Sequence, residues 1–139
     1  MNERFEKGRV LMSQMLGPDF SLGMEETAAS KGFGAEVGRL AIEQVFGDIW
    51  ARPGLGLKLR SIVVIASLAT LRARDELKNH LRVGLNNGLT SGELQEILIQ
   101  LIPYAGYPAV SNALVVAIEV LRERGLADDT KTAKERGLL

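Results

Sequence analysis

The only histidine of the chain, His80, stands four residues after Glu76 in the segment DELKNHLRVGLNNG. On a helix this spacing places both side chains on one side, where the carboxylate is able to orient the imidazole and favour its protonated form. An imidazole with an ordinary pKa of about 6.5 exchanges a proton near neutral pH, so the pair fits general acid–base catalysis. His80 also neighbours the apolar residues Leu77 and Leu81, and a buried structural histidine is the alternative.

Five further residues are candidates for a site. Glu96 is either a second proton-transfer group or a solvated helix residue. Arg52 and Arg60 are candidates to bind substrate carboxylates, because a guanidinium binds a carboxylate through two hydrogen bonds; on a helix surface they would form salt bridges instead. Trp50 and Tyr104 are candidates to line a pocket, although Trp50, at the end of an amphipathic segment, also fits a core position.

The composition excludes several classes of protein. Seventeen basic and seventeen acidic residues give a formal net charge of +0, which offers no electrostatic reason to expect nucleic acid or an anionic membrane as a partner. The chain has no cysteine, so disulfides and thiolate metal sites are excluded. A single histidine argues against a transition-metal site, and we expect neither a metal nor an organic cofactor.

The same sequence predicts a cytoplasmic protein. The longest apolar run, over residues 62–71, is interrupted by Ser67 and Thr70 and is too short to span a membrane. The N-terminal segment MNERFEKGRVLM is charged and amphipathic, unlike a signal peptide. A length of 139 residues fits one domain.

Apolar residues recur with a helical period, and strand alternation is absent. We predict an all-α, single-domain bundle of six helices over residues 1–139. The helices cover residues 1–17, 40–50, 58–72, 75–87, 90–102 and a last segment that ends at Gly125, with a loop over 18–33 and a mobile tail over 126–139. Thr90 and Glu93 form the pattern of a capping box, and Pro103 is expected to interrupt the fifth helix.

One helix carries more apolar surface than a small bundle needs. Residues 61–71 are apolar nearly all round, and Val115, Val116 and Val120 add to them. Excess apolar surface on a helix is usually buried in a subunit interface, so we expect a homo-oligomer.

Four blocks, FGDIWARPGL, LRSIVVIASLATL, ELKNHLRVGLNNGLTSGELQEILIQ and YAGYPAVSNAL, resemble the carboxymuconolactone decarboxylase family over residues 35–123. The resemblance implies the all-helical fold that this family shares with alkylhydroperoxidase D. It also implies a trimer or a hexamer.

The family contains two chemistries, and this sequence resembles only one. In the peroxidase branch, a Cys-x-x-Cys pair stands where this chain has Ala73 and Glu76, and a glutamate stands at Ser61. Without a thiolate, thiol peroxidase activity is excluded. The decarboxylase branch carries glutamate four residues before the histidine, as Glu76 and His80 stand here. Its W-x-R-P-G-L, Arg-Ser, LNNG and Y-x-G-x-P-A motifs are also present, and they add Ser61 to the substrate-binding candidates.

The resemblance implies cofactor-independent decarboxylation of a small, anionic, cyclic acid, as in the conversion of 4-carboxymuconolactone to an enol-lactone and carbon dioxide in the β-ketoadipate pathway of aromatic catabolism. A lactone isomerase or cyclase using the same histidine, or a non-catalytic oligomeric protein that binds a small molecule, are the alternatives. The segment TAASKGFGAEVGRL, Pro103 and Tyr107 depart from the family pattern, which leaves the identity of the substrate open.

Overall fold

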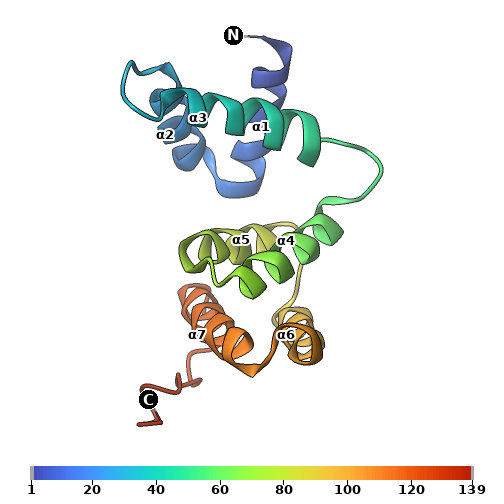
Figure 1. Cartoon of the computed structure of the whole chain (residues 1–139), viewed down its shortest axis with the longest axis vertical. Coiled ribbons are helices and arrows are strands. Elements are labelled where there is room, and N and C mark those ends of the chain that lie inside the picture. Colours follow the sequence, from blue (N-terminus) through green and yellow to red (C-terminus); the bar gives the residue numbers. More distant parts are fainter. Residues whose placement is uncertain (1, 139) are drawn as a thin grey trace. The chain divides into compact units, whose positions relative to one another are not determined.

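The computed structural model describes residues 2–138, which form helices and turns without a strand (Figure 1). The all-α prediction is therefore confirmed. The helices divide between two compact units, an N-terminal unit that reaches to Leu57 and a C-terminal unit that begins at Lys58. A single domain over 1–139 stays a prediction.

In chain order the elements are α1 (Glu3–Leu16), α2 (Pro18–Ala29), α3 (Ala35–Leu40), the π-helical η1 (Ala41–Trp50), α4 (Leu57–Leu71), α5 (Arg74–Asn86), α6 (Ser91–Ala105) and α7 (Tyr107–Glu123).

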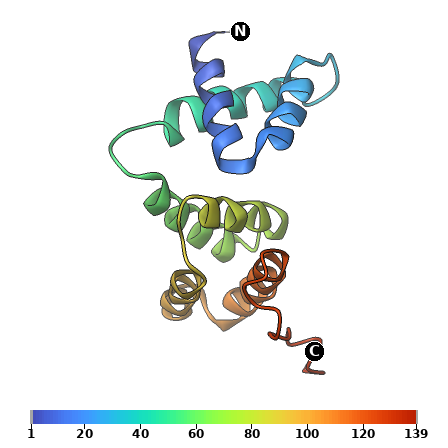
Figure 2. The same ribbon diagram turned by 180° about the vertical axis from the view of Figure 1, so that it is seen from behind.

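In the N-terminal unit, α1 crosses η1 at a very short distance (Figure 2). A Cβ atom on Gly8 would lie 2.0 Å from the carbonyl oxygen of Ile42, and one on Gly47 would lie 2.3 Å from the carbonyl oxygen of Arg4. Only glycine allows the two backbones to approach so closely. The core of this unit is apolar and is formed by Phe5, Met12, Met15, Ile42, Phe46 and Trp50.

The loop that we expected over residues 18–33 is wrong, because α2 occupies most of it. Pro18 stands at the start of the helix, where its fixed φ and missing N–H cost nothing. The helix lacks an apolar stripe: Phe20 and Leu22 are exposed, and Ser21 is its buried residue. The next predicted helix, over 40–50, begins earlier, at Ala35, and changes from α to π geometry at Ala41. These two differences also make the predicted number of six helices wrong.

In the C-terminal unit, α4 to α7 share one apolar core, to which Ile65, Leu81, Leu98 and Val116 contribute. The predicted capping box is confirmed: the Glu93 N–H donates to the Thr90 hydroxyl at 3.0 Å, and the Thr90 N–H donates to the Glu93 carboxylate at 3.1 Å.

Pro103 does not interrupt α6, which corrects our expectation. The proline lies inside the helix, which continues to Ala105 and ends at Gly106 with φ of 86°. Proline removes the hydrogen bond to the carbonyl four residues earlier, but only two residues of the helix follow it.

Residues that follow α7 contact that helix. Arg122 donates to the carboxylate of Glu135 at 2.8 Å, and Thr132 and Glu135 bond reciprocally through side chain and backbone. The mobility predicted for 126–139 stays a prediction. None of the helices over residues 2–138 combines the length and the hydropathy needed to cross a membrane.

Candidate active site

His80 lies on α5, the helix of the C-terminal unit whose buried side carries Leu77 and Leu81. Glu76 is exposed and His80 is half-buried, with its Nδ1 atom shielded from solvent. Burial lowers the pKa of His80 below its ordinary 6.5, because it disfavours the charged imidazolium, and the charge of Glu76 opposes this with a smaller effect. The predicted effect of Glu76 on the imidazole is thus present in direction, but desolvation outweighs it.

The face of α5 that carries His80 is turned toward α4. Gly84 follows His80 by one turn, and a Cβ atom on it would lie 2.9 Å from Cδ1 of Ile65 and 3.8 Å from Cβ of Ser61. At the end of the helix, the Asn87 amide donates to the Ser61 hydroxyl at 3.0 Å. Residues four and seven positions after His80 share its face, so His80 lies on the side of α5 that meets α4 at Gly84 and Asn87.

Ser61 and Arg60 are consecutive on α4 and lie in different surroundings. Ser61 is fully buried and its hydroxyl accepts the bond from Asn87. Arg60 is half-buried. The structure therefore brings Ser61 to the helix face of His80, as an interior group.

Glu96 lies on α6, where it lines an open hollow of about 670 Å³. Thr90, Glu93 and Gln100 line it as well, and the pKa of Glu93 is lowered by its bond from the Thr90 N–H and by Lys58. His80 is not in this lining. The apolar part of the hollow comes from α4 and α6 and consists of Ile62, Ala66, Ile97 and Leu101.

Tyr104 stands near the end of α6 with 82% of its surface exposed, and it is not among the residues that line the hollow of Glu96.

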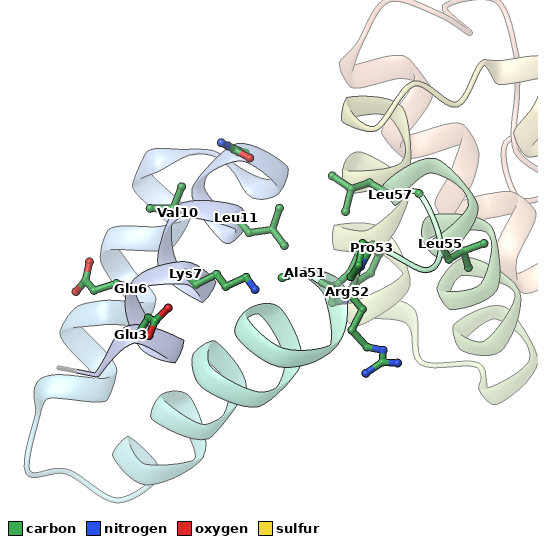
Figure 3. Close-up of a pocket in the computed structure, with 13 residues that line it drawn as sticks. Glu3, Glu6, Lys7, Val10, Leu11, Ala51, Arg52, Pro53, Leu55 and Leu57 are labelled. Carbon is green, nitrogen blue, oxygen red and sulfur yellow. The ribbon is translucent and has the colours of Figure 1, made fainter.

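Trp50 and Arg52 belong to the N-terminal unit, where they line a second open hollow of about 710 Å³ (Figure 3). Trp50 is buried in the core of that unit. Lys7 and Leu11 extend from α1 toward Ala51, whereas the Arg52 guanidinium points away from Lys7. The hollow combines apolar walls with two cationic side chains, Lys7 and Arg52, and two carboxylates, Glu3 and Glu6, so its charges do not favour an anion over other small molecules.

The sequence did not indicate Lys7 or the bond made by Asn87. Asn87 belongs to the LNNG motif, and its position seven residues after His80 is the signal that it shares the helix face of that histidine. Among residues 2–138 there is no group of three histidine, cysteine or acidic side chains arranged to hold a metal ion.

Residues 35–119 match the Carboxymuconolactone decarboxylase family, which is more than half of the chain, and the chain belongs to this family. It is 44% identical over 84 residues to 4-carboxymuconolactone decarboxylase of Acinetobacter baylyi, a match that covers 60% of this chain and 63% of that protein. It is 28% identical over 119 residues to nitrosuccinic acid decarboxylase of Metarhizium robertsii, covering 86% of this chain and 82% of that protein. The predicted family is confirmed.

Proposed function

We propose that this protein decarboxylates a small anionic acid whose own structure accepts the electrons, with 4-carboxymuconolactone as the first candidate substrate. The observation that carries the proposal is the half-buried His80 with its shielded Nδ1, in the segment that matches the family. Two relatives named as decarboxylases support it.

The chemistry follows from the substrate. When the bond between the ring and the carboxylate breaks, carbon dioxide leaves and the electron pair moves through the ring double bond into the lactone carbonyl. The nitro group of nitrosuccinic acid offers the same kind of electron acceptor. The protein then supplies a poorly hydrated environment for the leaving carboxylate and one proton for the carbon.

His80 supplies that proton. Because its pKa lies below 6.5, the imidazole is mostly neutral at pH 7 in the free protein. A bound carboxylate close to the ring favours the imidazolium, so binding of an anionic substrate loads the proton that the reaction consumes. Glu76, one turn before His80, favours the same charged form.

The remaining candidates keep the roles expected of them. Arg60, in the same unit as His80, binds a carboxylate of the substrate, and Glu96 is a second proton-transfer group beside its hollow. For Arg52, Trp50 and Tyr104, contact with the substrate stays a prediction. The position of Glu96 in the lining of a hollow of about 670 Å³ supports its role.

The decisive experiment is incubation of the purified, chelator-treated protein with 4-carboxymuconolactone and, separately, with nitrosuccinic acid. We expect release of carbon dioxide from at least one, at a rate that chelation leaves unchanged. A product with the mass of the substrate would show an isomerase or cyclase instead. Binding without turnover of either acid would contradict the proposal and favour a binding protein.

We also propose that the protein is a homo-oligomer, a trimer or a hexamer, with α4 at the subunit interface. Val116 and Val120 of α7 are buried in the chain's own core, whereas Leu59, Val63 and Leu71 of α4 are 51%, 58% and 74% exposed. Between them, Ser67 and Thr70 donate to carbonyl oxygens of α4 itself. With these hydroxyls satisfied, this face loses water at little cost.

A further inference from the structure

The turn after α5 does not need the side chain of Asn87. Gly88 takes the positive φ of 100°. The turn is closed by backbone bonds, from the Leu89 N–H to the Gly84 carbonyl at 2.9 Å and from the Gly88 N–H to the Leu85 carbonyl at 3.1 Å. Turn formation therefore leaves the amide of Asn87 available for another contact.

That contact is with Ser61, 26 residues earlier in the chain. Ser61 is fully buried, and the bond joins α4 to the residue that follows α5. A buried hydroxyl that lost this donor would be left in an apolar environment, which is unfavourable. The bond consequently fixes the position of α5 relative to α4.

The fixed segment includes His80. The stripe His80, Gly84 and Asn87 faces α4, and Gly84 brings the two helices close enough for a side chain as short as serine to reach Asn87. Any separation of α4 from α5 at this end would admit water along the stripe toward the imidazole.

We propose that Ser61 and Asn87 are positioning residues for His80, holding its helix against α4 so that the imidazole stays partly desolvated. The inference rests on the proposed function for its catalytic meaning, but the geometry and its test do not depend on activity. For Ser61, this role replaces direct contact with the substrate, because the side chain is fully buried.

The test is NMR titration of the imidazole without substrate, in the full-length protein. His80 is the only histidine, so its ring signals need no assignment. Ser61→Ala and Asn87→Ala should each raise the pKa of His80 by a few tenths of a pH unit toward 6.5, and the double variant should raise it no further than the larger single change.

Asn86→Ala is the matched control. Asn86 is the same residue type in the same turn, and its side chain accepts from Arg124 at 3.0 Å on the exposed side. Loss of this bond should leave the His80 pKa unchanged, whatever it does to the melting temperature.

Unaltered titration of His80 in a folded Ser61→Ala protein, or an equal shift in Asn86→Ala, would overturn the proposal. Should Asn87→Ala fail to fold, Ser61→Ala decides alone, since it removes a single oxygen atom. If decarboxylation is established, the two variants should lower kcat more than they change KM. An inactive wild-type protein that shows the titration shifts would refute only the proposed function.

Discussion

Glu76 and His80 stand one turn apart on α5, with the carboxylate in solvent and the imidazole half-buried. The charge of Glu76 and the burial of the ring shift the pKa of His80 in opposite directions. Burial lowers the pKa of His80, and the Glu76 charge raises it by less. The balance leaves the pKa of the ring below 6.5.

Removing the charge of Glu76 should therefore lower the His80 pKa further. We expect Glu76→Gln to shift the NMR titration of His80 downward, whereas Asp75→Asn, which removes a neighbouring charge on the same turn, should have little effect. An upward shift in Glu76→Gln would contradict the assigned balance.

The lowered pKa also predicts how stability depends on pH. Above 6.5 His80 is neutral in both folded and unfolded chains and contributes no pH dependence. As the pH falls below 6.5, the unfolded chain takes up a proton first, so His80 lowers the free energy of unfolding until the folded-state pKa is passed. Urea unfolding at pH 7.5 and pH 5 should show a smaller loss on acidification for His80→Gln than for the wild type. An equal loss in both would mean that burial does not lower this pKa.

The crossing of α1 and η1 should tolerate no side chain at Gly8. A Cβ atom there meets backbone atoms, which cannot move aside, so Gly8→Ala should destabilise the protein by about 3 kcal/mol or more. At Gly84 the nearest atoms are terminal methyl groups of Ile65 and Leu89, and Gly84→Ala should cost less, about 1 kcal/mol. Gly23, with nothing within 4 Å, serves as the control, and Gly23→Ala should stabilise α2 by about 0.5–1 kcal/mol. If denaturant unfolding shows that Gly8→Ala lowers the free energy of unfolding by less than Gly84→Ala does, the close crossing of α1 and η1 would be contradicted.

The exposed face of α4 should hold the subunits together. Val63→Lys places a charge in the middle of that face, and we expect it to convert the wild-type oligomer to a smaller species in light scattering after size exclusion. Leu114→Lys on α7, where the leucine is similarly exposed, is the matched control and should leave the oligomer intact. A monomeric wild-type protein would refute this part of the account.

What could be predicted from the sequence was mostly local. The capping box at Thr90 depends on residues three positions apart, so the local sequence predicts it. The helix α4 could be predicted because a long apolar run stands between helix-breaking residues. By contrast, α2 buries little more than Ser21, so it leaves no apolar period to detect.

For the site, the family pattern indicated His80 and Glu76 as neighbours, and helix geometry agrees. The bond between Ser61 and Asn87 could not be predicted, because it depends on how two helices pack, at 26 residues of separation. For Trp50 the sequence could not distinguish a core position from a pocket position, because an amphipathic segment is compatible with both. In the structure Trp50 is buried in the core of the N-terminal unit and also lines the hollow.

The most direct test of the central claim is the rate of carbon dioxide release from 4-carboxymuconolactone by the wild-type protein and by folded His80→Gln at pH 7. If His80 donates the proton to carbon, the variant should lose about 100-fold or more of kcat while its circular dichroism stays that of the wild type. A variant that releases carbon dioxide at the wild-type rate would contradict the assignment of His80 as the acid.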